Sequence, residues 1–387
     1  MEKISSILSE ILTYDTICIT IAAIVFVLFV IQIGLYFNLY RRIATFRLMN
    51  KKPIRENEPA ISIIVPLFVE DSLYLDNQLH TLLTQDYKEF EVVLVYVGKS
   101  DDFFNEIKSL QKHHPNLSPI QIDYSPRYPV STKIALNVGI KGAKHDFIVI
   151  TSYDATPSSD RWLKLLAKGF IYGDIVLGYS GIKKQTGFKN FIFREYQFNK
   201  SLAWISSAIK GKTYAGSRSA LGFKKELYFN VRGFNHLDMN VGEDDLFVQQ
   251  IATRDNVSVV LSPRATCTEQ TWGGFGWWMR RAKLLRTTRS FYPKGVLRGV
   301  TSELVTRTLF FIAAIAALIV LPWEFKAAAL GLLVVRYLLV WFVFTRNARR
   351  LGERGLASLH IFYDFIEPIF RLFVIMTPIK QSRKTWN

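Results

Sequence analysis

Three adjacent carboxylates in the second half of the chain are the first candidates for chemistry. The acidic run Gly242-Glu243-Asp244-Asp245 directly precedes the apolar run Leu246-Phe247-Val248. The carboxylates therefore lie where a helix would begin and where its dipole favours negative charge. Clustered carboxylates are readily shifted in pKa and suit acid–base chemistry. Acidic residues also cap helices without any further role, and the pattern alone leaves both interpretations open.

Another carboxylate, Asp154, follows an apolar strand-like run in the sequence TSYDATP. A carboxylate at this place can bind Mg²⁺ or Mn²⁺, which prefer oxygen ligands and retain several waters. Ser152 stands two residues earlier and offers a hydroxyl, which either serves as a weaker ligand or contacts a bound ligand directly. The alternative is that Asp154 is a turn residue ahead of Pro157, because Asp is common in turns.

A third constellation combines aromatic and basic side chains in the run Trp277-Trp278-Met279-Arg280-Arg281. The planar guanidinium groups of Arg280 and Arg281 suit phosphate. The indole of Trp278 offers a stacking surface. Membrane interfaces also select Trp and Arg, so a basic aromatic belt at a bilayer surface is the competing interpretation.

The elements that would position these residues form an alternating α/β pattern between Pro59 and Gln270. The pattern predicts strands at Ile61–Leu67, Glu91–Val97 and Phe147–Thr151, with helices at 73–83 and 133–143 between them. Continuous β-branched runs such as ISIIVPL are typical of buried parallel strands. Ligands of such sheets bind beyond the carboxyl ends of the strands, so the loops after Val65, Val97 and Thr151 are the ones expected to hold the site.

The amino-terminal part predicts a membrane anchor. Residues 16–40 carry no charge, and a helix of that length crosses the hydrocarbon of a bilayer. A signal peptide fits poorly, because Arg41-Arg42 stands where small residues would be needed for cleavage. Basic residues accumulate after the helix, which by the positive-inside rule places the rest of the chain in the cytoplasm; they are Arg41, Arg42, Arg47, Lys51, Lys52 and Arg55.

A second apolar region predicts a helical hairpin that begins near Leu304, with spans at 308–321 and 327–345 joined by a turn at 322–324. The last apolar stretch, 359–379, is interrupted by charged residues and Pro368, so both an interfacial and a kinked crossing helix remain open. Arg336 lies inside the second span, where an unpaired charge is costly. We expect it to pair with Glu367, or with Asp364 one turn away; snorkelling to an interface is the alternative.

Composition separates the remaining classes. Hydrophobic residues make up 49% of the 387 and aromatics 14%, which excludes a disordered chain. The net charge of +17 suits a membrane surface or a diphosphate, and no nucleic-acid motif accompanies it, so we expect no nucleic-acid partner. Two cysteines, Cys18 and Cys267, provide neither a disulfide framework nor a cysteine-ligated metal site, and they favour a reducing compartment.

The region 61–292 resembles the inverting, membrane-anchored glycosyltransferases of family 2, which have a GT-A fold. Three ordered segments carry the resemblance: ISIIVPLFVEDSLYLDNQLHTLLTQDYKEFEVVLV, KIALNVGIKGAKHDFIVITSYDATPSSDRWL and GFNHLDMNVGEDDLF. The implied fold class is an α/β GT-A nucleotide-diphosphosugar transferase domain with a mainly parallel sheet, plus N- and C-terminal transmembrane helices.

The resemblance also implies roles. It makes Asp244 the general base, with Asp245 as the fallback and Glu243 orienting the acceptor, and Asp154 the residue that binds Mg²⁺ or Mn²⁺. Trp278 would line the acceptor site. The implied donor-binding residues are Pro66, Glu70, Asp101, Lys133, Ser152, Asp154, Arg280 and Arg281.

The chain departs from the family pattern at three positions. Ser152 replaces the first acid of the usual Asp-x-Asp motif, and Tyr96 and Val97 replace an acidic pair after the second strand. Tyr96 is expected to stack on the base of the nucleotide instead of hydrogen-bonding to it. These departures leave room for a catalytically degenerate scaffold of a glycan-assembly complex.

The expected organisation is an anchor at 1–42, a basic linker at 43–58, a cytoplasmic catalytic domain at 59–298, a transmembrane hairpin at 299–347 and a carboxyl-terminal helix with a basic tail at 348–387. The resemblance implies a hexosyltransferase of polysaccharide biosynthesis that uses a nucleotide-diphosphosugar, expected to be a UDP-sugar. The acceptor would be a lipid-linked or surface glycan at the cytoplasmic face of a bacterial inner membrane.

Overall fold

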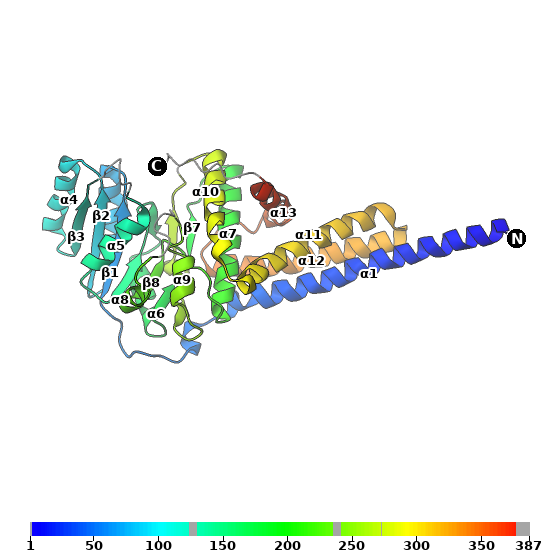
Figure 1. The fold of residues 1–387 in the computed structure, drawn as a ribbon, viewed down its shortest axis with the longest axis horizontal. Coiled ribbons are helices and arrows are strands. Elements are labelled where there is room, and N and C mark those ends of the chain that lie inside the picture. Colours follow the sequence, from blue (N-terminus) through cyan, green and yellow to red (C-terminus); the bar gives the residue numbers. More distant parts are fainter. Residues whose placement is uncertain (1, 124–129, 235–240, 272, 377–387) are drawn as a thin grey trace.

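The computed structural model describes residues 2–123, 130–234, 241–271 and 273–376. A rounded α/β domain carries a rod of long helices that ends at the amino terminus (Figure 1). The expected fold class, a GT-A-like α/β domain with apolar helices at both ends of the chain, is confirmed.

The main sheet has the strand order β3-β2-β1-β4-β8-β6-β9. Strands β3, β2, β1 and β4 run parallel, whereas β8 is antiparallel to both of its neighbours. The strands are β1 (Ile61–Leu67), β2 (Phe90–Val97), β3 (Leu117–Ile122), β4 (Phe147–Ile150), β6 (Ile175–Leu177), β8 (Leu221–Lys224) and β9 (Val257–Val259). A second sheet has the order β5-β10-β7 and consists of β5 (Ala155–Pro157), β10 (Cys267–Glu269) and β7 (Ser180–Ile182).

Helices cover both faces of the main sheet (Figure 1). The helices of the domain are α2 (Ser72–Tyr74), α3 (His80–Leu83), α4 (Asp101–His113), α5 (Thr132–Gly142), α6 (Trp162–Phe170), α7 (Phe188–Ile209), α8 (Lys225–Asn230), α9 (Leu246–Ile251) and α10 (Phe275–Thr287). The π-helix η2 (Leu75–Leu79) joins α2 to α3 in one helical segment, and the 3-10 helices are η1 (Leu48–Asn50), η3 (Pro263–Ala265) and η4 (Thr288–Phe291). The three strands and two helices expected from the sequence therefore form within a residue or two of their predicted ends.

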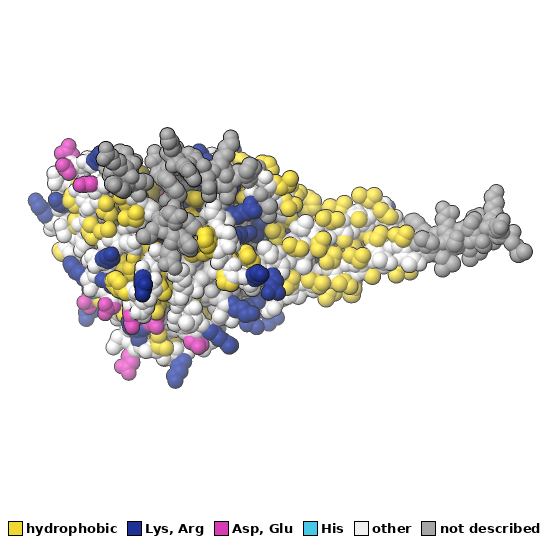
Figure 2. Space-filling view, in the orientation of Figure 1, with side chains coloured by type: hydrophobic (Ala, Val, Ile, Leu, Met, Phe, Trp, Pro, Cys, Tyr) yellow, Lys and Arg dark blue, Asp and Glu magenta, His cyan; other side chains and the backbone are white. Residues whose placement is uncertain are grey.

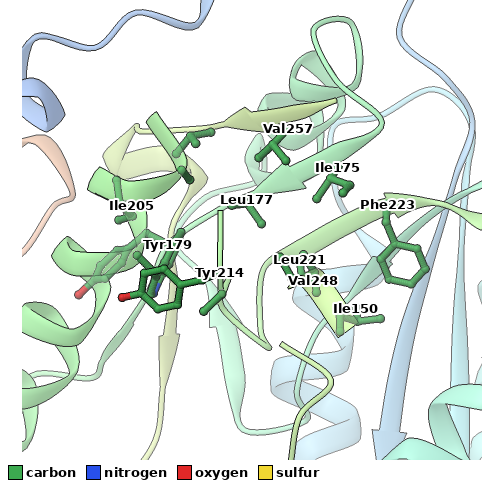
Figure 3. Packing of buried hydrophobic residues seen from close by; sticks show 14 of the residues in the cluster. Ile150, Ile175, Leu177, Tyr179, Ile205, Tyr214, Leu221, Phe223, Val248 and Val257 are labelled. Atoms are coloured by element: carbon green, nitrogen blue, oxygen red, sulfur yellow. The ribbon is translucent and has the colours of Figure 1, made fainter. Parts of the chain in front are cut away.

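Two hydrophobic layers hold the sheet in place. Successive side chains of β1 point to opposite faces: Ile64 packs in the layer with α5 and α7, and Ile63 in the layer with α4 and α6. Figure 3 shows the first layer, in which Leu177, Leu221 and Val248 meet between the sheet and the neighbouring helices. Burial on both faces explains why these strands read as continuous apolar runs.

The rod consists of α1 (Glu2–Thr45), α11 (Lys294–Val320) and α12 (Trp323–Arg350). The segments Asp15–Thr45, Lys294–Val320 and Trp323–Arg350 are long and apolar enough to cross a membrane. Apolar side chains cover the rod, and Lys and Arg side chains gather where it meets the domain (Figure 2). Helix α11 begins earlier than the expected start near Leu304, because Pro293 caps a helix that runs without a break into the apolar span.

The carboxyl-terminal helix α13 (His360–Met376) packs at the base of the rod against α7, α10, α11 and α12 (Figure 1). It is not among the three candidate membrane spans of the described chain. Residues 377–379 of the expected apolar stretch lie outside the described residues.

Buried ion pairs join α13 to the rod. Arg336 Nη1 lies 2.6 Å from Asp364 Oδ2, and Arg307 Nη1 lies 2.7 Å from Asp364 Oδ1. Glu367 accepts from Arg307 at 2.7 Å and from Arg371 Nε at 2.8 Å. The expectation that Arg336 pairs with the last segment is confirmed, with Asp364 as the partner, because other arginines occupy Glu367.

The expected linker lies against the domain. The backbone N–H of Ile54 donates to the Ile171 carbonyl at 2.7 Å, and Arg55 forms an ion pair with Asp174. Lys51 Nζ donates to the Val257 carbonyl at 2.5 Å. The basic segment after α1 is thus fixed to the surface of the domain near β9 and α6.

Candidate active site

The acidic run lies at the amino end of α9, where its backbone makes a sharp turn. Gly242 has φ of +117°, a conformation that L side chains rarely adopt. A Cβ at this position would also lie 3.3 Å from Lys133 Nζ and 3.2 Å from a Leu246 methyl carbon. The glycine therefore lets the chain turn tightly enough to present three consecutive carboxylates in different directions.

Asp245 is fully engaged by its surroundings. Its Oδ1 accepts from the backbone N–H of Leu246 at 2.7 Å and caps α9. Its Oδ2 accepts from the hydroxyls of Thr288 at 2.6 Å and Tyr292 at 2.7 Å. The helix-cap interpretation thus holds for Asp245, which ties the acidic run to the segment that follows α10.

Asp244 and Asp245 both line a cavity of about 340 Å³, whose wall also includes residues of α1, α7, α10, α11 and α13. Burial, with the neighbouring charges of Asp245 and Glu243, raises the pKa of Asp244 from 3.8 to about 7, against the opposing charges of Lys200 and Arg218. A carboxyl group that titrates near neutral pH can accept a proton from a hydroxyl and return it to solvent.

Glu243 faces a second, smaller cavity of about 90 Å³ at the carboxyl ends of β1 and β4. Pro66 and Ser152 line the same cavity, so two of the expected donor-site residues meet there. The sequence placed Glu243 beside the acceptor, whereas the structure places it on the side of the sheet edge, where ligands of parallel sheets bind.

Asp154 lies at the same edge, directly before β5. Its side chain is buried, and its Oδ1 has no hydrogen-bond partner among the described residues. Burial and the charge of Glu269 raise its pKa, whereas Arg218, Arg281 and a hydrogen bond from Ser152 oppose the shift.

Sequence reasoning missed Arg218, which stands at the centre of this edge. Its guanidinium lies 3.2 Å from Ser152 Oγ. Burial lowers its pKa, but Asp154, Glu243, Glu269 and Asp244 together raise it above the usual value. The residue comes from the Ser217-Arg218-Ser219 turn before β8, and β8 runs antiparallel to β4. That pairing, which local sequence does not reveal, carries Arg218 to the end of β4.

Glu269 is a second residue that sequence reasoning missed, and it forms an ion pair with the expected residue Arg281. Arg281 Nη2 lies 2.9 Å from Glu269 Oε2, and Glu269 Oε1 accepts from Ser180 at 2.9 Å and from Ser219 at 2.7 Å. Burial opposes ionisation of Glu269, but Arg281, Arg218 and these hydroxyls lower its pKa. The ion pair aims one of the two expected arginines at the edge that holds Asp154.

The other expected donor-site residues differ in their positions: Lys133 lies close to Glu243, whereas Asp101, Arg280 and Glu70 are exposed. Lys133 is buried beside Gly242, and its charge lowers the pKa of Glu243, which burial and Asp245 raise. Asp101 begins α4 and is exposed, and so is Arg280 on α10. Glu70 is an exposed loop residue whose Oε1 accepts from the Tyr96 hydroxyl at 2.5 Å.

Two aromatic residues expected to stack on ligands pack inside the protein. Tyr96 is fully buried on β2, with Phe103 and Phe104 against its ring. Trp278 is 3% exposed, and its ring lies 4.9 Å from Phe193 and 4.4 Å from Phe370. In this structure Tyr96 therefore belongs to the core, and Trp278 joins α10 to α7 and α13 rather than presenting an open face.

The donor set fits a hard divalent ion only in part. Asp154 Oδ1 and Glu243 Oε2 are buried oxygens without hydrogen-bond partners among the described residues, and both suit Mg²⁺ or Mn²⁺. No group of three acidic, histidine or cysteine side chains that could hold a metal occurs in the described ranges. Any ion there must take its remaining ligands from the substrate and from water, as Mg²⁺ commonly does.

The sheet is mainly parallel, and carboxylates and arginines meet at the carboxyl ends of β1 and β4. With the acidic run ahead of α9, these features are those of a GT-A-like glycosyltransferase. The chain belongs to glycosyl transferase family 21, whose family model matches residues 24–374. The expectation of a glycosyltransferase is therefore confirmed, and the protein is an enzyme of that class. Its three long apolar helices suit the expected membrane anchor.

A solved structure shows the same fold. The mannosyltransferase PcManGT from Pyrobaculum calidifontis, in complex with GDP-Man and Mn²⁺, superposes with a TM-score of 0.55 over 89% of this chain and 99% of that one, at 20% identity. TarS of S. aureus gives a TM-score of 0.42 over 78% of this chain and 55% of TarS, at 17% identity.

A curated relative from Methanococcus voltae, dolichyl N-acetyl-alpha-D-glucosaminyl phosphate 3-beta-D-2,3-diacetamido-2,3-dideoxy-beta-D-glucuronosyltransferase, is 39% identical over 102 residues. The match covers 26% of this chain and 30% of that relative. This chain thus spans about a third of the length of the relative it matches.

Proposed function

We propose that the protein transfers a sugar from a nucleotide-diphosphosugar to a lipid-linked acceptor at the cytoplasmic face of the membrane, with inversion at the anomeric carbon. One observation carries the proposal: Asp244, with a pKa of about 7, lines a cavity that extends to the membrane helices. Its neighbour Glu243 faces the smaller cavity at the carboxyl ends of β1 and β4, which we take as the donor site. The acidic run therefore stands between this donor site and the acceptor site.

The reaction is a single displacement. A hydroxyl oxygen of the acceptor attacks the anomeric carbon while its proton passes to the Asp244 carboxylate. The bond from the anomeric carbon to the diphosphate oxygen breaks, and the nucleoside diphosphate leaves with the electron pair. Attack opposite the leaving group inverts the configuration. Asp245 is held by Thr288 and Tyr292, which leaves Asp244 as the proton acceptor.

The donor side supplies positive charge for the leaving diphosphate. Arg218 lies among the carboxylates at the edge of the sheet, and Glu269 orients Arg281 toward the same place. Asp154, with Ser152, would hold a Mg²⁺ or Mn²⁺ ion that neutralises further charge on the diphosphate. The solved mannosyltransferase with GDP-Man and Mn²⁺ supports a nucleotide-sugar donor with a divalent ion. A UDP-sugar donor stays a prediction.

The lipid-linked acceptor rests on the position of the cavity and on the curated relative, whose name describes a dolichyl phosphate substrate. The cytoplasmic face rests on the basic residues after α1 and the positive-inside rule. The bacterial inner membrane expected from the sequence also stays a prediction.

The decisive experiment uses the full chain in detergent with a panel of nucleotide-sugars, and it measures released nucleoside diphosphate and the anomeric configuration of the product. Asp244→Asn should lower turnover by about 10²- to 10⁴-fold while donor binding is retained. Asp255→Asn, the same change at an exposed carboxylate, is the matched control. Retained turnover in Asp244→Asn would exclude Asp244 as the general base. If the wild-type protein transferred no sugar from any donor, a catalytically degenerate scaffold would be favoured instead.

A further inference from the structure

The large cavity holds a cationic residue that the proposed transfer reaction does not use. Arg289, on η4, lines the cavity together with Asp244. Its guanidinium is partly buried and forms no ion pair within 4 Å among the described residues. Tyr196, Tyr214 and Tyr292 line the same cavity.

The surroundings of Arg289 disfavour its charge. Burial and the neighbouring guanidinium of Arg371 lower its pKa, and only the three tyrosines oppose this effect. A partly buried arginine is stabilised when an anion pairs with it. Arg289 therefore offers a position for a negatively charged group.

Except for Asp244, the carboxylates of the cavity wall already have hydrogen-bond or ion-pair partners. Asp245 accepts three hydrogen bonds, and Glu367 lies between Arg307 and Arg371. Asp364 lies between Arg307 and Arg336. None of the cavity carboxylates forms an ion pair with Arg289 among the described residues, so its guanidinium can take an anion that enters the cavity.

The same cavity has an apolar side toward the rod. Val305 and Leu309 of α11 are 53% and 48% exposed, and Leu372 of α13 is 51% exposed. All three line the cavity, and α11 is one of the candidate membrane spans. A hydrocarbon chain can therefore leave the cavity between α11 and α13 and enter the bilayer without crossing polar surface.

We propose that this cavity binds an anionic lipid acceptor, whose phosphate pairs with Arg289 and whose hydrocarbon chain leaves between α11 and α13. Lys200 also lines the cavity, and its charge lowers the pKa of Asp244. Because Arg289, Lys200 and Asp244 line one cavity, a headgroup that carries both a phosphate and a hydroxyl can contact the cationic residues and Asp244 together. This inference rests on the proposed function for the meaning of the word acceptor, but the binding site itself does not depend on it.

The test measures binding of radiolabelled dodecyl phosphate to the full chain in discs of zwitterionic lipid, with dodecanol and inorganic phosphate as competitors. Unlabelled dodecyl phosphate should compete best, because only this probe has both the charge and the chain. Arg289→Gln should weaken its binding by about 10- to 100-fold, the range of charge-assisted hydrogen bonds. Arg289→Lys should recover part of the loss, because it keeps the charge without the planar fork.

The matched control is Lys294→Gln, which removes one exposed positive charge from the same segment but leaves the cavity unchanged. It should leave dodecyl phosphate binding within about 2-fold, since surface charges contribute little. Unchanged nucleotide binding and thermal unfolding in Arg289→Gln show that the variant is folded.

Three results would overturn the inference. They are wild-type binding by Arg289→Gln, equal competition by dodecanol, which would mean an apolar pocket without a phosphate site, and equal competition by inorganic phosphate, which would mean a site for free anions. Because the assay needs no donor and no turnover, its outcome is separate from that of Asp244→Asn.

Discussion

The pKa of Asp244 makes a quantitative prediction for the pH dependence of catalysis. The base must be ionised to accept the proton, and burial with the charges of Asp245 and Glu243 raises its pKa to about 7. The ionised fraction is then about one-tenth at pH 6, one-half at pH 7 and nine-tenths at pH 8. We therefore expect kcat/KM to rise about tenfold per pH unit below 7 and to level off above it.

The same pKa predicts a cost in stability at alkaline pH. A carboxyl whose pKa rises from 3.8 to about 7 on folding holds its proton in the folded state but not in the unfolded state between these values. Its contribution to stability is fully present below about pH 3.8 and is lost as the pH rises through 7. The upper limit of the loss is about 4 kcal/mol.

Asp244→Asn removes this titration and should therefore raise Tm, and more at pH 8 than at pH 5, although it lowers turnover. The assay combines pH–rate profiles between pH 5 and 9 with thermal unfolding of both proteins in the same detergent. Asp255→Asn should change neither profile. A flat rate profile across this range, or an Asp244→Asn variant that is less stable than wild type at pH 8, would refute the reasoning.

Three further predictions concern the donor site and the membrane helices. Asp154→Ala or EDTA should weaken nucleotide-sugar binding substantially, because the ion would lose its buried carboxylate ligand; equal affinity in calorimetry with and without metal would shift the role to the arginines. Arg218→Gln should lower kcat about 10²- to 10³-fold, as loss of a preorganised donor to developing charge does elsewhere, with thermal unfolding as the check on folding. Asp364→Leu should cost about 3 to 5 kcal/mol, because it leaves the buried Arg336 without its ion pair. Arg336→Leu should cost less, because Asp364 still pairs with Arg307. In unfolding assays the double mutant should lose less than the sum of the two single losses; additive losses would reject the pair.

The sheet and the edge that holds the candidate site could be predicted, because buried strands have a recognisable local sequence of apolar residues. The strand Ile61–Leu67 forms as expected, since a strand covered on both faces needs an unbroken apolar run. The acidic residues Asp154 and Glu243 were likewise found from their places after a strand and before a helix. Their partners were not, because Arg218 and Glu269 reach the edge through the antiparallel pairing of β8 and through the second sheet. Neither pairing leaves a pattern in the residues around it.

Among the charged residues near the long apolar helices, some partners could likewise be predicted from sequence and others could not. Arg336 could be assigned an acidic partner in advance, because an arginine in the middle of an apolar helix must find one, and only the choice between Asp364 and Glu367 needed coordinates. Arg289 sits in a basic run that also reads as a surface attracted to headgroups. Its significance appears only when α1, α7, α11 and α13 close a cavity around it and every carboxylate within reach but Asp244 is committed to another partner. A guanidinium without an ion pair among the described residues, in the same cavity as the proposed base, is what favours a substrate site over a membrane-binding surface.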